Sequence, residues 1–134
     1  MAVLLFAWLG WGGVIWACCG RIFVSQLGHW LVNYVCHTSG TLRYELDGAG
    51  EEGRNHWLFG ALSMGEGWHN NHHAWPDSAR FGIGWREPDP GWWMVCVLER
   101  LGLAWDVQTM ETVALRPNAR ERGGAASLTT PGSS

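Results

Sequence analysis

Lysine is absent from this sequence of 134 residues, and all nine basic side chains are arginines. Twelve acidic residues bring the net charge to −3, so the chain lacks the excess of positive charge that binds nucleic-acid phosphates. Charged residues make up only 16% of the chain and hydrophobic residues 47%. This balance excludes intrinsic disorder for most of the chain, because disordered proteins are rich in charge and poor in apolar residues.

The positions of the cysteines follow no known pattern. The four cysteines form no CxxC pair, and Cys18 and Cys19 are adjacent in an apolar run. This arrangement argues against a secreted disulfide scaffold and against a cysteine-type zinc site. The zinc-protease motif HExxH, the phosphate-binding motif GxxxxGK[ST] and the hydrolase motif GxSxG are also missing.

Charge is missing altogether from residues 1–20, and Arg21 is the first charged residue. A helix of this length spans about 30 Å, the thickness of the hydrocarbon core of a bilayer. A signal peptide is one alternative, but it needs a basic region before its apolar stretch. A buried core helix is the other, and so short a chain cannot easily supply the large partner domain that such a helix needs. We therefore predict a membrane segment.

A second nearly uncharged stretch follows, at residues 22–37. A continuous helix over residues 2–37 would be about 54 Å long, so its end would project from the bilayer as a stalk. His29, Asn33 and His37 are spaced four residues apart and would share one face of this stalk. Polar side chains that can bind metal, on an otherwise apolar helix, usually face a bundle interior or a cavity.

The rest of the chain reads as short elements joined by turns. Glycine-rich, acidic residues 38–55 predict a loop, and residues 56–68 predict a helix too short to span a bilayer. Residues 91–101 predict a further helix with Gly102 near its C-terminal cap and with two tryptophans suited to the membrane–water boundary. Residues 108–134 become polar and low in complexity, so we expect a disordered tail there.

Three of the six histidines, His69, His72 and His73, fall within five residues. On a helix the second and third would lie one turn from the first and form a patch of three imidazoles. A metal ion is the simplest partner for all three, although imidazole suits zinc, copper, iron and nickel alike. The alternative is a polar or pH-sensing surface patch.

Two more side chains near the cluster are open to more than one interpretation. Glu66 lies on the same predicted helix face and could orient an imidazole, bind metal directly or favour the helix N-terminus. His56 stands at a junction of loop and helix, where a structural or surface role is the simpler interpretation.

Residues 54–80, RNHWLFGALSMGEGWHNNHHAWPDSAR, closely resemble the third histidine box of membrane-bound fatty acid desaturases. The upstream HWLVNYVCH resembles the family's W-x-V-N-x-x-x-H element. The downstream DPGWWMVCVLERLGLAWDV is similar to the tail of the bacterial acyl-CoA Δ9 type. The three motifs occur in the family's order and together cover residues 29 to about 107.

The resemblance implies a role for individual residues. His69, His72 and His73 match histidines that ligate a di-iron centre, and His37 matches the ligand at the end of the stalk helix. Asn33 matches an asparagine that reaches one iron through water. Glu66 matches the glutamate of the G-E-x-W-H run, where a role in orienting a ligand is plausible. His29 is not a family position, and we expect at most a contact behind the ligands; His56 stands where asparagine is usual and receives no ligand role.

The resemblance also implies a reaction: O2 and two electrons serve to remove two hydrogens from an acyl chain. The substrate would be an acyl-CoA or an acyl-lipid, and the electron donor a cytochrome b5-, ferredoxin- or rubredoxin-like protein. The family's earlier HxxxxH and HxxHH boxes do not precede the histidine cluster here. Four matched histidines and one asparagine are too few for two irons, so we expect a C-terminal portion that needs the N-terminal part and is inactive alone.

The predicted fold is therefore all-α. Residues 1–37 form a transmembrane helix with a cytoplasmic extension, residues 38–107 a histidine-rich metal-binding region, and residues 108–134 the tail. Arg21 follows the apolar run and favours a metal site on the cytoplasmic side of an integral membrane protein. A related di-iron lipid hydroxylase and a non-catalytic membrane fragment are the alternatives.

Overall fold

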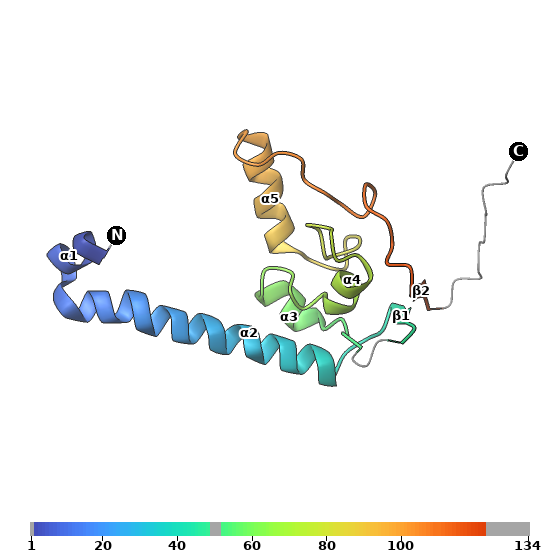
Figure 1. Cartoon of the computed structure of the whole chain (residues 1–134), viewed down its shortest axis with the longest axis horizontal. Coiled ribbons are helices and arrows are strands. Elements are labelled where there is room, and N and C mark those ends of the chain that lie inside the picture. Colours follow the sequence, from blue (N-terminus) through green and yellow to red (C-terminus); the bar gives the residue numbers. More distant parts are fainter. Residues whose placement is uncertain (1, 49–51, 123–134) are drawn as a thin grey trace, which may run out of the picture. The chain divides into compact units, whose positions relative to one another are not determined.

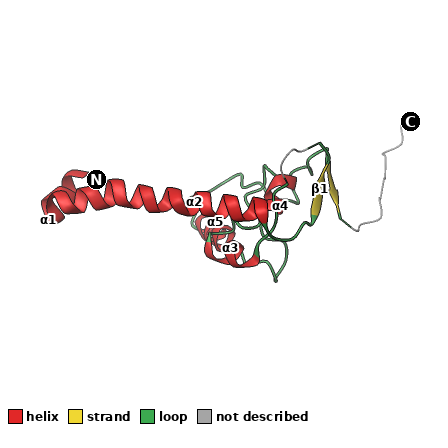
Figure 2. Ribbon diagram, turned by 90° about the horizontal axis from the view of Figure 1, so that it is seen from below, coloured by secondary structure: helices red, strands yellow, loops and turns green. Residues whose placement is uncertain are grey.

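The computed structural model describes residues 2–48 and 52–122 and contains two compact units, Met1–Tyr34 and Val35–Ser134. The first unit is helical, whereas the second consists of short helices joined by loops and turns (Figures 1 and 2). The only regular β-structure among the described residues is one pair of short strands. The predicted all-α fold class is confirmed.

The first unit is an apolar helical segment made of α1 (Ala2–Ile15), the π-helical turn η1 (Trp16–Gly20) and the greater part of α2 (Arg21–Thr38). The uninterrupted helix predicted from residue 2 is broken at Gly10, where φ is 62° and ψ is −162°. Glycine adopts this conformation readily because it has no Cβ. A second irregularity, the π-turn η1, separates the kinked helix from α2.

The segment Phe6–Thr38 is long and apolar enough to cross a membrane. It has 33 residues and a mean hydropathy of 1.3 over its best window, and none of that window is buried within the protein. The stretch after the kink at Gly10, residues 11–38, by itself measures about 42 Å, more than the roughly 30 Å of the hydrocarbon core. The lack of burial argues against the alternative of a core helix, because the large apolar side chains face outward.

The second unit contains the strand pair. β1 (Tyr44–Leu46) pairs antiparallel with β2 (Ala119–Glu121), with Leu46 opposite Ala119. Tyr44, Leu46 and Ala119 are buried together with Ala74 of α4, and Trp75, Ile83 and Leu115 pack against them. The prediction of a loop over residues 38–55 therefore missed β1, because three residues are too few to show an alternating pattern.

The predicted disordered tail differs from the structure in its first part. Residues 108–122 are described, and they end in β2, whose Ala119 belongs to the core of the second unit. Ala119 packs in the core although its neighbours in the sequence are polar, and composition alone does not reveal this. The remainder of the predicted tail, residues 123–134, lies outside the described residues.

The helix predicted over residues 56–68 is shorter in the structure. α3 (Trp57–Leu62) ends in a tight turn in which Met64 and Gly65 have φ values of 57° and 96°. After the turn the chain passes so close to α3 that a Cβ on Gly67 would lie 2.1 Å from the backbone nitrogen of Gly60. The close approach requires glycine at both positions, and it places the indole of Trp68 against Gly60.

Two short helices complete the second unit. α4 (His69–Ala74) carries the histidine cluster, and α5 (Pro90–Arg100) lies within one residue of its predicted range. Asp89 caps α5: its Oδ1 accepts the backbone N–H of Trp92 at 2.9 Å, and its Oδ2 accepts those of Phe81 and Gly82. Gly102 follows α5 with a φ of 68°, which confirms its expected place at the C-terminal end of the helix.

Candidate metal centre

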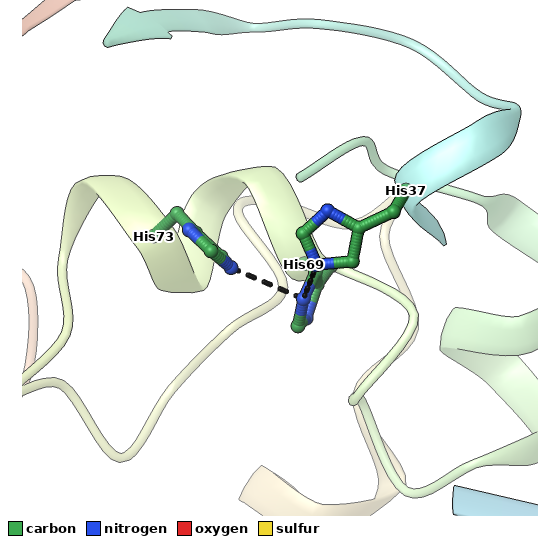
Figure 3. Close-up of side chains that lie close together, drawn as sticks. All are labelled: His37, His69 and His73. Carbon is green, nitrogen blue, oxygen red and sulfur yellow. Dashed lines mark hydrogen bonds between the residues drawn. The ribbon is translucent and has the colours of Figure 1, made fainter. Parts of the chain in front are cut away.

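Three imidazoles converge in the second unit (Figure 3). His69 and His73 lie one turn apart on α4, and His37 comes from the last turn of α2. The Nε2 atom of His69 is 3.1 Å from the Nε2 atom of His37 and 3.1 Å from that of His73. Among the described residues, these three form the group of possible metal ligands whose donor atoms all lie within 4.8 Å of one another.

This geometry fits a metal ion better than it fits hydrogen bonding alone. An imidazole nitrogen carries either one hydrogen or one lone pair in the ring plane, so the Nε2 of His69 cannot serve both neighbours well. Metal-bound imidazole nitrogens lie about 2.0–2.1 Å from a zinc-like ion, which puts ligands of a tetrahedral site about 3.4 Å apart. The two observed separations of 3.1 Å are close to that spacing. The three side chains therefore fit one cation, and imidazole accepts iron as well as zinc, copper or nickel.

Three buried asparagines hold α4 in place. The Oδ1 of Asn55 accepts the backbone N–H groups of Asn70 and Asn71 at 2.9 and 3.2 Å, and its Nδ2 donates to the Oδ1 of Asn71 at 2.8 Å. Asn55 thus satisfies backbone donors in the first turn of α4 that have no partner within the helix. The amide of Asn71 continues the network by donating to the carbonyl of Phe81 and to Glu87.

Asn70 connects α4 to the segment that leads into β1. Its Oδ1 accepts the N–H groups of Arg43 and Tyr44 at 2.8 and 2.7 Å, and its Nδ2 donates to the carbonyls of Tyr44 and Gly53 at 3.0 and 2.8 Å. The side chain is fully buried, and all its hydrogen-bonding capacity is used. The two asparagines between the cluster histidines therefore fix the backbone from which the imidazoles project.

Gly53 packs directly against the two imidazoles of α4. A Cβ at this position would lie 2.9 Å from the Cδ2 atoms of both His69 and His73. Real Cβ atoms essentially never come so close to another heavy atom, so a larger side chain would displace both rings. Absence of a side chain at Gly53 is thus a condition for the observed site.

Replacing Gly53 with alanine should weaken metal binding without removing any ligand. The added methyl group pushes the rings of His69 and His73 from their positions, and loss of such supporting geometry lowers metal affinity by roughly 10-fold or more. The measurement is a Co2+ titration of the full chain followed by visible absorption. Gly28→Ala is the matched control, because a Cβ there meets nothing within 4 Å; equal affinity of the two variants would contradict the role of Gly53.

His72 lies beside the group rather than within it. Its ring centroid is 6.1 Å from that of His69, 6.0 Å from that of His73 and 4.5 Å from the ring of Phe81. Its Nδ1 is buried and has no hydrogen-bond partner in the described part of the chain. Burial lowers the pKa of His72 below its ordinary value, opposed by the negative charge of the nearby, exposed Glu66. A lowered pKa keeps the imidazole neutral, the form that can bind a metal.

The other predicted site residues occupy different places. Asn33 and His29 are exposed in the first unit, and their assigned roles stay predictions. His56 precedes α3, and its ring lies 5.1 Å from that of Phe59. The sequence analysis missed Gly53, Asn55 and the structural roles of Asn70 and Asn71. The position of two asparagines between His69 and His72 was the one signal that could have indicated such roles.

The comparisons with known proteins agree with the desaturase resemblance. A family model described as fatty acid desaturase matches residues 1–87. An acyl-CoA 5-desaturase from Anemone leveillei is 40% identical over 115 residues, which cover 86% of this chain and 35% of the relative. An sn-1 stearoyl-lipid 9-desaturase from Anabaena variabilis is 42% identical over 108 residues, 81% of this chain and 39% of the relative.

A third relative is a chloroplastic palmitoyl-monogalactosyldiacylglycerol delta-7 desaturase from Arabidopsis thaliana, 41% identical over 108 residues, 81% of this chain and 28% of the relative. The chain thus spans about a third of the length of these curated relatives. No solved structure matches it. The region matched by the family model contains all three converging histidines, and this chain belongs to the fatty acid desaturase family.

Proposed function

We propose that this chain supplies the C-terminal part of an integral membrane desaturase that introduces a double bond into an acyl chain with O2 and a di-iron centre. The observation that carries the proposal is the convergence of the Nε2 atoms of His37, His69 and His73 on a position that fits a metal ion. The family match and the names of the relatives support the reaction class.

In this proposal His37, His69 and His73 hold one iron together. His72 binds iron with its neutral imidazole. Burial lowers the pKa of this imidazole, and the negative charge of the exposed Glu66 opposes that shift. Asn33 reaches iron through a water molecule, and His29 makes at most a contact behind the ligands. These side chains are too few for two irons, so the remaining ligands belong to the two thirds of the relatives' length that the chain does not span.

The chemistry that a bound iron pair supplies is the removal of two hydrogens from an acyl chain at the expense of O2 and two electrons. The residues of this chain contribute rigid positioning. Asn55, Asn70 and Asn71 hold the backbone of α4, and Gly53 leaves room for the two imidazoles. The buried Trp68 directly precedes α4 and donates its indole N–H to the carbonyl of Pro88 at 2.8 Å.

The proposed location is a membrane crossed by the segment Phe6–Thr38, with the metal site on the cytoplasmic side. This segment is longer than the hydrocarbon core, and Arg21 ends its uncharged first part. Positive charge at the end of a spanning stretch favours the cytoplasmic side. The substrate is an acyl-CoA or an acyl-lipid, since relatives of both descriptions match the chain. The electrons come from a cytochrome b5-, ferredoxin- or rubredoxin-like donor.

The test joins this chain to the N-terminal part of the Anabaena variabilis relative and expresses the chimera in a host that supplies electrons. We expect lipids or acyl-CoA with two fewer hydrogens, no product from the chain alone, and none from the chimera with His69→Ala. A product that gains an oxygen atom would instead establish the hydroxylase alternative. An iron-loaded chimera without any product would support the non-catalytic alternative.

A further inference from the structure

The second unit carries a hollow of about 450 Å³ lined by Trp57, Trp85, Arg86, Pro88 and Trp93, here called the tryptophan hollow. Its three indoles are 60%, 86% and 58% exposed, respectively. Large aromatic rings bury most of their surface in soluble cores, so three open indoles around one hollow are unusual. A contiguous apolar surface of this kind marks a place of interaction.

The hollow has a fixed internal arrangement. The indole N–H of Trp57 donates to the carbonyl of Arg86 at 3.1 Å, which anchors the ring. The guanidinium carbon of Arg86 lies 4.9 Å from the ring centre of Trp85. The cation and the aromatic face therefore form one amphipathic surface rather than separate, independently moving side chains.

The guanidinium of Arg86 can bind an anion from outside the protein. Arg86 makes no ion pair with another described residue. The nearby acids are engaged elsewhere: Glu87 accepts hydrogen bonds from Asn71 and from the backbone of Ile83, and Asp89 caps α5. The hollow thus combines exposed indoles with one positive charge that forms no ion pair within the described part of the chain.

Helix α5 extends this surface. Trp93 lines the hollow, and Val97 and Leu101 follow it at intervals of four residues on the same helix face. All three side chains and the adjacent Met94 are more than half exposed, and no residue of α5 is buried. The apolar line of α5 and the tryptophan hollow therefore form one continuous exposed face.

We propose that this face lies in the headgroup region of a bilayer that contains anionic lipid, as a membrane contact additional to the segment Phe6–Thr38. Indoles concentrate at the membrane–water boundary because one edge is polar and the ring is apolar. An arginine among them is complementary to lipid phosphate, and an amphipathic helix lies in the same plane. The second unit begins at Val35, inside the candidate membrane segment, so it is covalently tethered to any bilayer that this segment crosses. The proposal goes beyond the desaturase activity, because neither metal nor acyl substrate takes part in it.

The test measures the depth of α5 in the full chain, reconstituted into lipid discs of phosphatidylcholine with and without phosphatidylglycerol. In a background in which Cys18, Cys19 and Cys96 are replaced by alanine, a fluorophore is attached to Val97→Cys or to the control Glu99→Cys on another side of the helix. Buried Cys36 is retained. Brominated acyl chains quench from the membrane and iodide quenches from water.

We expect the label at position 97 to be quenched at least about 2-fold more by brominated lipid than the label at 99, and less by iodide. Phosphatidylglycerol should increase the quenching by brominated lipid, and Arg86→Gln should make this increase about 5-fold smaller. One basic residue near an anionic surface contributes an attraction of that size. Equal iodide quenching at both positions would overturn the proposal. A label at 97 that is shielded from iodide and from lipid alike would show a polypeptide partner instead, and an unchanged lipid dependence in Arg86→Gln would refute the role of anionic lipid.

Discussion

Replacing His69 with alanine should lower the metal affinity of the chain by more than about 100-fold, the largest effect we expect from a single substitution. His69 is the central member of the site, because its Nε2 lies 3.1 Å from the Nε2 atoms of both His37 and His73. Loss of a residue that merely supports a ligand already costs about 10- to 100-fold in affinity, so loss of the central ligand costs more. Titration of the full chain with Co2+ in mild detergent, followed by visible absorption, measures the effect.

The control for this experiment is His56→Ala. The imidazole of His56 packs on Phe59 and lies outside the group of converging ligands, so its removal should leave Co2+ affinity nearly unchanged. Circular dichroism of both variants shows whether helix content is retained. Unaltered Co2+ binding by a folded His69→Ala variant would refute the metal centre.

Replacing Asn70 with alanine should destabilise the second unit by about 3–5 kcal/mol. The substitution removes four hydrogen bonds from a fully buried amide and strips partners from Arg43, Tyr44 and Gly53. Each backbone group left buried without a partner costs about 1–3 kcal/mol, and the partly exposed Arg43 recovers some of this by binding water. Urea unfolding of the full chain, followed by tryptophan fluorescence, gives the change in the free energy of unfolding.

Asn118→Ala is the matched control for that loss. Its amide also donates to a backbone carbonyl, that of Asp47, at 2.7 Å, but this hydrogen bond lies at the surface. Water replaces it, so we expect a change within about 1 kcal/mol. Asn70→Asp separates the two halves of the buried amide, because a carboxylate can accept from Arg43 and Tyr44 but cannot donate to Gly53. Equal stability of the Asn70→Ala and Asn118→Ala variants would contradict the importance of the buried network.

The histidine spacing predicted that His69 and His73 lie together, but it did not predict which other imidazole lies closest to them. Residues 69–74 form a helix, and the i, i+4 spacing places His69 and His73 together as expected. The spacing also grouped His72 with them, whereas in the structure the third converging imidazole is His37, thirty-two residues upstream of His69. Helical periodicity determines which residues share a face of one helix, but the contact between α2 and α4 depends on the turns between them.

The supporting residues show the same division. Asn70 and Asn71 lie between the histidines in the sequence, but no local sequence feature distinguishes a buried asparagine from an exposed one. The partners of Asn70 are the backbone of Arg43, Tyr44 and Gly53 and the side chain of Asn55, all at least fifteen residues away. The partners of Asn71 are Asn55, Phe81 and Glu87, all at least ten residues away. Gly53 likewise resembles any loop glycine until two imidazoles are seen against it.

The sequence by itself determined the family, the helical class, the uncharged segment and the range of α5, because motif order, composition and helix-end signals are local properties. The tertiary structure decided that His37, rather than His72, converges with His69 and His73. It alone decided which asparagines hold α4 and which tryptophans remain exposed around Arg86. The pairing of residues 44–46 with residues 119–121 as strands also appears only in the tertiary structure. Each of these outcomes requires two distant segments to meet, and the free energy that selects such a meeting comes from burial and from hydrogen bonds that neither segment can form alone.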